Sequence, residues 1–399
     1  MKKILTLKYL LIASAFLLVI RFIGALPSFQ KDFHSVEDYI IAKNIVDGKG
    51  YSLTPALGPT AIKVPVYPLF LALLLFIGKT KLFIVIIQLI ISFTIPFLIN
   101  TFVKELNSER NGIIVGYLYL LYPPYIFYPF VLEVTNLFVP LALLFSILLL
   151  RKYKSDINGA KDWIIIGIMA ALLSLTQAVA FVVVSGLLLL ILFKKKYKPV
   201  TISLVTMIIC FSPWIIRNYL AFDKFIPLKS VVWMNVYEGY LPQYHMTGKY
   251  DIIDKKVKAN IDSLKMKIND VNMEKYYRET AIKAISKDPL LYVHKSLTQA
   301  VNFWFITPRY YNMSIIFILF VFVPTITIFM LFLTGTRNFL KIDKKLTFTL
   351  LIILMYFTLI YSLTQASNIR FRLDIEWMLI LIASFAFKTK NKDTILKTS

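Results

Sequence analysis

The stretch from Ser212 to Gly239 reads SPWIIRNYLAFDKFIPLKSVVWMNVYEG and joins a long apolar run to a long polar segment. Arg217 and Asn218 lie where the chain is expected to leave a lipid bilayer, with proline and aromatic residues around them. Charge is costly at a membrane boundary, so an ionisable side chain there is a candidate functional residue. The alternative is that Arg217 only extends its guanidinium to the aqueous interface. The stretch alone does not decide between the two.

The composition around this stretch indicates a membrane protein. Of the 399 residues, 58% are hydrophobic and only 17% are charged, and the mean hydropathy is +0.69. Many apolar runs approach the roughly 20 residues that a transmembrane helix needs. We therefore predict an all-α polytopic membrane protein with about ten transmembrane helices.

The formal net charge of +23 would suit a nucleic-acid-binding protein, but the distribution of the lysines argues against one. They cluster in short segments between apolar runs, which is typical of cytoplasmic loops in membrane proteins. We expect a lipid bilayer around the protein and no nucleic-acid partner. The basic clusters are Met1–Lys3, Arg151–Lys154, Lys194–Lys196, Lys341–Lys345 and Lys388–Lys397.

Cysteine and histidine usage excludes several kinds of site. The single cysteine, Cys210, lies in an apolar run, so the chain has no disulfide framework and no cysteine-based metal site. Its three histidines are scattered. No GxGxxG or P-loop pattern occurs, so we expect no nucleotide site. We predict no firmly bound cofactor, and the sequence leaves the participation of a divalent cation open.

Ten apolar runs, with the N-terminus in the cytoplasm, place every basic cluster and the C-terminal tail on the cytoplasmic side. Arg21 interrupts the first run and no clear cleavage site follows it, so we expect an uncleaved helix rather than a signal peptide. The expected crossings are Lys8–Leu26, Leu82–Val103, Asn111–Tyr128, Pro129–Leu150, Trp163–Thr176, Ala178–Phe193, Val200–Leu220, Met313–Leu333, Leu346–Leu363 and Arg372–Phe387.

One further apolar run, Val64–Gly78, is too short for an ordinary crossing. Counting it as one would invert every later loop and place Lys194–Lys196 outside, against the charge bias. We therefore predict a re-entrant or interfacial helix with both ends on the outer face.

This topology divides the chain into three parts. Residues 1–220 form an N-terminal transmembrane module that includes a first outer loop at 27–81. Residues 221–311 form an outer helical cap, and residues 312–399 form C-terminal helices with a cytoplasmic tail. Apolar spacing from Glu37 predicts an amphipathic helix on the membrane surface, stopped at Gly48. In the cap, Met273–Lys287 is the clearest helix.

Few acidic residues fall on the predicted outer face. Glu37 and Asp38 lie in the first outer loop, and Glu133 follows an aromatic and proline-rich turn. An acid buried beside aromatic residues has a raised pKa and can act as a general base. The alternative for Glu37 and Asp38 is a solvated position in the first helical turn, where the helix dipole favours acids.

Basic residues on the same face are the complementary candidates. Lys63, Arg217, Arg370 and Arg372 lie at or near predicted outer ends of helices, where positive charge is statistically disfavoured. Arginine suits bidentate recognition of phosphate, so these side chains fit a membrane-anchored phosphate substrate. Lipid-headgroup contacts, or pairs with Asp374 or Glu376, are the alternatives.

Several segments, in order, resemble the GT-C fold of polyprenyl-phosphate-sugar-dependent glycosyltransferases. Within that fold the chain looks closest to bacterial relatives of the protein O-mannosyltransferases and the lipid A aminoarabinose transferase, which are family 39-like. The resemblance covers nearly the whole chain. Its segments are Glu37–Tyr51, Pro65–Ala72, Pro213–Tyr219, Phe225–Pro227, Asn235 with Gly239, Ala281–Trp304 and Arg370–Leu373.

This resemblance implies transfer of a sugar from a polyprenyl-phosphate carrier to a membrane-associated lipid, glycan or protein. The reaction would occur on the outer face of the bacterial cell membrane, in the synthesis of a cell-envelope glycan or lipopolysaccharide, with inversion at the anomeric carbon. An acid of the first loop would deprotonate the acceptor hydroxyl, and arginines would hold the departing lipid phosphate. Tyr67, Asn218 and Asn235 fall in the resembling segments and are expected to contact substrate.

The acidic positions depart from the family's pattern. The acid expected four residues before the loop-one tyrosine falls on Ser35, and the glutamate of the second outer turn falls on Thr135. Glu37 or Asp38 could take the catalytic role, or Asp32 or Glu133 could supply the acid. The alternative function is a catalytically altered relative that binds or transports a lipid-linked saccharide.

Overall fold

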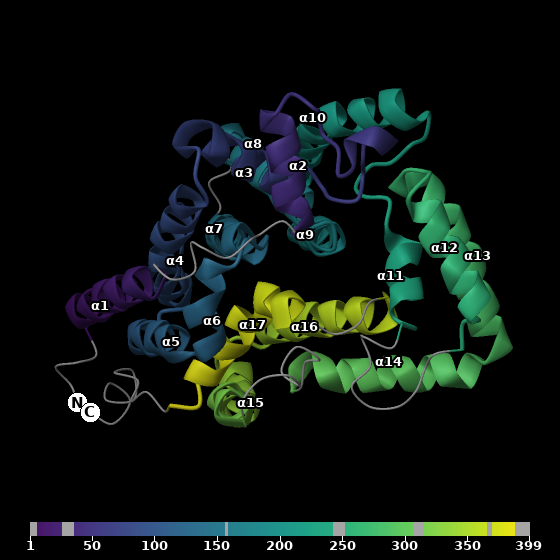
Figure 1. Ribbon diagram of the computed structural model, residues 1–399. Coiled ribbons are helices and arrows are strands. Elements are labelled where there is room, and N and C mark those ends of the chain that lie inside the picture. Colours follow the sequence, from purple (N-terminus) through teal and green to yellow (C-terminus); the bar gives the residue numbers. More distant parts are fainter. Residues whose placement is uncertain are drawn as a thin grey trace, which may run out of the picture.

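The computed structural model describes residues 6–25, 36–155, 159–241, 252–305, 315–364 and 369–387. Every regular element within these ranges is a helix (Figure 1), consistent with the predicted all-α fold. The α-helices are α1 (Leu7–Ala25), α2 (Glu37–Val46), α3 (Val66–Gly78), α4 (Lys81–Lys104), α5 (Glu109–Leu121), α6 (Pro123–Phe127), α7 (Thr135–Lys154), α8 (Ala160–Thr176), α9 (Ala180–Leu190), α10 (Tyr197–Phe222), α11 (Val232–Glu238), α12 (Lys255–Lys265), α13 (Asp270–Lys287), α14 (Pro289–Trp304), α15 (Ile315–Ile342), α16 (Lys344–Thr364) and α17 (Ile369–Ser384).

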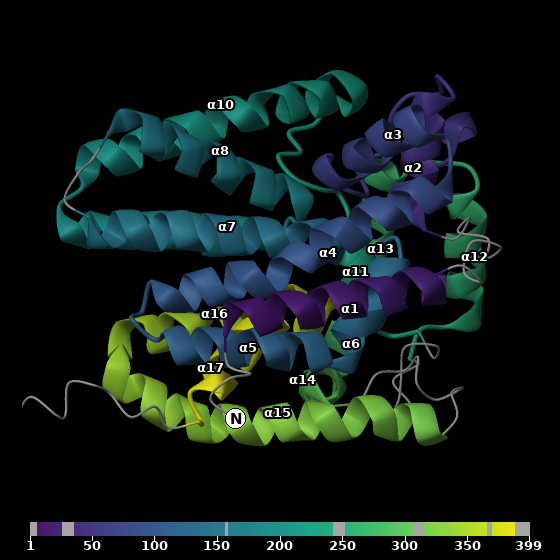
Figure 2. The same ribbon diagram turned by 90° about the vertical axis from the view of Figure 1, so that its left-hand side faces the viewer.

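Long apolar helices form a bundle whose axes run in nearly one direction (Figure 2). The C-terminal end of α7, the N-terminal end of α10 and the junction of α15 with α16 lie together at one end of this bundle. Contacts between basic segments hold that end, because the Lys196 ammonium donates to the carbonyl oxygens of Lys152 and Ser155. Of the predicted basic clusters, the structure therefore gathers the three that it describes, Arg151–Lys154, Lys194–Lys196 and Lys341–Lys345, on one side, as the charge pattern predicts.

The structure does not show the ten membrane crossings that were predicted. Each predicted crossing overlaps at least one helix, but in the described part of the chain only α1, α4, α7, α10, α15 and α16 are long and apolar enough to span a bilayer. The bent pair α5 and α6 could make a seventh. With 17, 11 and 16 residues, α8, α9 and α17 are shorter, and α17 carries four charged residues in its first half.

The boundary predicted between the third and fourth crossings is wrong in detail. A single helix was expected over Asn111–Tyr128, but the chain bends by 67° between α5 and the segment that begins at Pro123. Two consecutive prolines lack backbone N–H groups, so the α5 hydrogen-bond ladder cannot continue through them. Helix α7 consequently begins at Thr135 rather than at Pro129.

The segment predicted as the first outer loop contains the two helices predicted for it. Helix α2 begins at Glu37 and ends before Gly48, whose φ of +74° suits the absence of a side chain. Its buried face packs on the short apolar helix α3. Helix α3 has 13 residues, so the structure confirms that it is a short element. Its re-entrant or interfacial position stays a prediction.

Helices α11 to α14 lie near the end of the bundle opposite the basic turns (Figure 2). Tyr237 of α11 packs against Tyr277 of α13, with Ile261 and Met273 in the same apolar cluster. The Glu274 carboxylate also accepts hydrogen bonds from two N–H groups at the start of α11. These helices occupy the region predicted as a cap, and its separation as a domain stays a prediction.

Candidate functional site

A polar cavity of about 470 Å³ lies at the bundle end that carries the cap. Segments far apart in the sequence form it: the start of α2, the loop before α3, the start of α7, the end of α8, the loop before α11, α11 itself and the start of α17. Its ionisable lining residues are Glu37, Asp38, Lys63, Glu133, Lys229, Glu238, Arg370 and Asp374.

At one wall, Lys63 faces the two acids at the start of α2. Its ammonium lies 2.8 Å from Glu37 Oε2 and 3.4 Å from Asp38 Oδ2. The loop before α3 presents Lys63 because the Tyr51 hydroxyl donates to the carbonyl oxygens of residues 63 and 64. The structure thus brings together three residues that the sequence singled out separately.

The two adjacent acids differ in their electrostatics. The Lys63 ammonium lowers the pKa of Glu37 and stabilises its charged form. Burial raises the pKa of Asp38, which is only 5% exposed, although Lys63 opposes the shift. Asp38 is therefore the stronger base of the two when it is ionised, and its carboxylate lines the cavity.

Another part of the cavity lining contains a second ion pair and a hydrogen-bonded acid. Arg370 NH1 lies 3.2 Å from Glu133 Oε1. Asp374, one turn further along α17, accepts hydrogen bonds from the Thr135 hydroxyl at 2.6 Å and from the Gln177 side-chain amide at 2.9 Å. These contacts fix the start of α17 against α7 and the end of α8.

Lys229 is a third cation in the cavity, and it differs from the other two. Within the described ranges, no carboxylate lies within ion-pair distance of its ammonium, whereas Lys63 and Arg370 each have an acidic partner. Burial and the neighbouring Lys63 and Arg370 charges lower the pKa of Lys229 to about 8. An anionic ligand placed beside Lys229 would therefore stabilise its charged ammonium.

Helix α11 supplies the remaining polar lining. Asn235 faces the cavity, as does Glu238 one turn later. Burial raises the pKa of Glu238. Asn235 was expected to contact substrate, and its position in the lining is compatible with that prediction.

Arg217 does not line this cavity. Its guanidinium donates to the carbonyl oxygens of Tyr51 at 2.9 Å and Thr60 at 2.8 Å, and it lies over the rings of Tyr51, Trp214 and Phe222. These contacts tie the end of α10 to the first outer loop. The assignment of Arg217 to a substrate phosphate stays a prediction, and its observed contacts are structural.

Arg372 is also placed away from the cavity. It is 2% exposed and its Nε lies 3.0 Å from Glu376 Oε1, which is the pairing given above as the alternative to phosphate binding. Its guanidinium also contacts the Tyr122 hydroxyl and the Trp304 carbonyl oxygen. These contacts hold α17 against α6 and α14.

The two remaining candidates for substrate contact have internal partners. The Tyr67 hydroxyl donates to Gln88 at 2.8 Å, and the Asn218 amide donates to the Ile226 carbonyl oxygen at 2.8 Å. Both side chains are buried, and neither lines the cavity. Asp32, an alternative source of the acid, lies outside the described residues.

Sequence reasoning passed over Lys229, Glu238 and Gln177. A signal for Lys229 was present, because it follows Ile-Pro-Leu in the same stretch as Arg217 and lies on the face where lysine is disfavoured. Glu238 carries no comparable signal. Gln177 and Asp374 fall in segments compared with the resembling family, but neither was assigned to the site.

In the described ranges, no group of three or more His, Cys, Asp or Glu residues has the arrangement of a metal site. Four of the cavity acids, Glu37, Asp38, Glu133 and Asp374, are instead held by cations or by hydrogen-bond donors. The charge available to stabilise an anionic leaving group in the cavity is that of Lys63, Lys229 and Arg370.

Residues 61–216 match the model of the dolichyl-phosphate-mannose-protein mannosyltransferase family. The matched part contains Lys63, Glu133 and Gln177 of the cavity, whereas α2, Lys229 and α17 lie outside it. No curated protein and no solved structure matches the chain. Together with the long apolar helices, the family match supports a membrane glycosyltransferase of the GT-C type.

The contacts of Arg217 predict a role in stability. Arg217→Lys keeps the charge but cannot reproduce the paired hydrogen bonds to the Tyr51 and Thr60 carbonyl oxygens. We expect a loss of about 1–2 kcal/mol, seen as a lower melting temperature of the detergent-purified protein. The exposed Arg110→Lys is the control. A loss of polyprenyl-phosphate binding at an unchanged melting temperature would contradict this role.

Proposed function

We propose that the protein transfers a sugar from a polyprenyl-phosphate carrier to a hydroxyl of a membrane-associated lipid, glycan or protein. The observation that carries this proposal is the juxtaposition, in one cavity, of a buried acid with three cations from separate segments. The family match supplies the class of reaction, because the dolichyl-phosphate-mannose-protein mannosyltransferases are named for a lipid-phosphate sugar donor.

Asp38 is the proposed general base. It lines the cavity, its pKa is raised by burial, and its contact with Lys63 is longer than that of Glu37. Glu37 is better suited to holding Lys63 in place, because the 2.8 Å pair keeps its carboxylate charged. Glu133 has the corresponding role toward Arg370.

Lys229 and Arg370 are the proposed ligands of the donor phosphate, with Lys63 close by. Lys229 brings a positive charge without an acidic partner in the described part of the chain. Arg370 brings a planar guanidinium suited to phosphate oxygens. Negative charge develops on the phosphate as the bond to the sugar breaks. Positive side chains that are already in position therefore stabilise the transition state more than the ground state.

The proposed transfer is a single displacement at the anomeric carbon of the sugar. The acceptor oxygen attacks the anomeric carbon, the bond from that carbon to the phosphate oxygen breaks, and its electron pair leaves with the lipid phosphate. The acceptor proton passes to Asp38. Attack opposite the leaving group inverts the anomeric configuration, and Lys229 and Arg370 stabilise the phosphate that departs.

We also propose that the cavity opens on the outer face of a bacterial cell membrane. The basic turns lie at the opposite end of the bundle, and such turns are typically cytoplasmic. Both termini would then be cytoplasmic if the number of crossings is even.

Asp38→Asn tests the base. We expect sugar transfer in membranes supplied with polyprenyl-phosphate sugars to fall by about 10²–10⁴-fold, while donor binding is retained. Asp47→Asn, at the exposed end of the same helix, is the matched control and should keep full activity. Glu37→Gln should lower transfer less than Asp38→Asn. Unchanged transfer in Asp38→Asn would refute the assignment, and absence of transfer in the wild type would favour a function limited to lipid-linked saccharide binding or transport.

The lowered pKa of Lys229 predicts that donor binding depends on pH. Its ammonium is charged below a pKa of about 8 and neutral above it, so donor binding should weaken as the pH rises through that value. Lys229→Gln should raise the donor KM about tenfold or more. Lys229→Arg should preserve binding and remove the dependence, because arginine stays charged. Lys224→Gln, in the same loop but exposed, is the control. An identical pH profile in the wild type and Lys229→Arg would contradict the assignment.

A further inference from the structure

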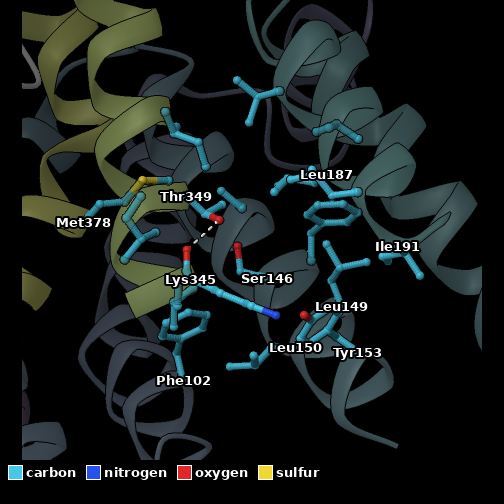
Figure 3. Close-up of a pocket in the computed structure, with 18 of the residues that line it drawn as sticks. Phe102, Ser146, Leu149, Leu150, Tyr153, Leu187, Ile191, Lys345, Thr349 and Met378 are labelled. Atoms are coloured by element: carbon cyan, nitrogen blue, oxygen red, sulfur yellow. Dashed lines mark hydrogen bonds between the residues drawn. The ribbon is translucent and has the colours of Figure 1, made fainter. Parts of the chain in front are cut away.

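A second and larger cavity, of about 770 Å³, lies between α7, α9, α16 and α17 (Figure 3). Its walls are formed mainly by aromatic and aliphatic side chains, which suit an apolar occupant. The described residues that line it share no member with the lining of the polar cavity. Representative wall residues are Phe138, Phe145, Leu149, Leu187, Ile353 and Met378.

The cavity is elongated along the bundle. On α7 its lining extends from Phe138 to Lys154, a distance of about 24 Å at 1.5 Å per residue. One leaflet occupies half of the roughly 30 Å hydrocarbon core of a bilayer. The apolar part of the cavity is therefore long enough for a lipid acyl chain.

The end of the cavity at the basic turns is cationic. Lys154, Lys194 and Lys345 line it there, and Asp343 is its single acidic lining residue within the described ranges. Asp343 already accepts a hydrogen bond from the Leu346 N–H as the cap of α16. This end of the cavity therefore carries a net positive charge, whereas the rest of the cavity wall is mainly apolar.

Lys345 has the position expected of a headgroup ligand. Its side chain extends from α16 across the cavity toward Leu149 and Tyr153 of α7 (Figure 3). In the part of the chain that the structure describes, no carboxylate lies within ion-pair distance of its ammonium. Lys194 lies nearby on the other wall, with its ammonium 4.8 Å from the centre of the Tyr153 ring.

We infer that this cavity binds an anionic phospholipid, with the phosphate at Lys345 and Lys194 and an acyl chain between α7 and α16. Basic pockets between transmembrane helices at the cytoplasmic side recognise anionic headgroups, and each buried methylene adds to the affinity. A zwitterionic lipid lacks the net charge that these lysines would neutralise.

This site is separate from the proposed donor site. The donor phosphate is assigned to Lys229 and Arg370, at the far end of α7 and α17 from the lysines of the apolar cavity. Because α7 and α17 line both cavities, the phospholipid would brace the helices that carry Thr135 and Asp374. Its binding can be measured without any sugar transfer.

Native mass spectrometry of the detergent-purified full chain tests the inference. Dioleoylphosphatidylglycerol should remain bound several-fold more than dioleoylphosphatidylcholine, and glycerol 3-phosphate, which has no acyl chains, should not be retained. The double variant Lys345→Gln, Lys194→Gln should lower phosphatidylglycerol retention several-fold. The exposed neighbour Lys344→Gln should leave it unchanged.

A second pair of variants tests the apolar part. Ala142→Phe fills the cavity from α7 and should reduce retention, whereas Leu144→Phe, at an exposed position of the same helix, should not. Equal retention of the two lipids would overturn the inference, as would unchanged phosphatidylglycerol retention in the double lysine variant. If Ala142→Phe does not fold, judged by its size-exclusion profile, the lysine variants decide.

Discussion

The Asp270 carboxylate holds together the two loops on which the polar cavity depends. It accepts hydrogen bonds from the Thr60 hydroxyl at 2.8 Å, the Ala61 N–H at 3.0 Å and the Ser230 hydroxyl at 2.7 Å. Thr60 and Ala61 precede Lys63, and Ser230 follows Lys229, so one side chain at the start of α13 connects both lysine-bearing loops to the cap. Loops without regular structure need such external partners to hold charged groups in a fixed arrangement.

Of the three cations in the cavity, two have acidic partners and one has none within ion-pair distance in the described ranges. Lys63 is held by the acids of α2, and Arg370 by Glu133. Lys229 lies near both of these cations, and its pKa is lowered first by burial and then by their charges. An anion that enters the cavity would relieve this repulsion, and Asp38 provides a base nearby. Donor binding and proton removal would thus depend on the same group of charges.

Much of this arrangement follows from local sequence signals. Hydropathy predicts the long helices, and Gly48 and Pro289 predict where α2 and α13 end. Lys63, Glu37, Asp38, Glu133 and Arg370 were singled out separately, and the fold brings them to one cavity. The role of Arg217 could not be predicted, because its partners are backbone carbonyl groups brought close only by tertiary packing. For Arg372 the sequence offered the Glu376 pair as an alternative, but not the contacts with Trp304 and Tyr122. The bend at Pro123 had a local signal in the two consecutive prolines, but the single apolar run around them was interpreted as one helix.

A structure of the protein with polyprenyl phosphate bound would test the central claim most directly. We expect the phosphate in the polar cavity, with its oxygens within hydrogen-bond distance of the Lys229 ammonium and the Arg370 guanidinium. Asp38 would face the phosphate across the space that a sugar occupies. A phosphate bound instead at Arg217, or elsewhere outside the cavity, would contradict the account.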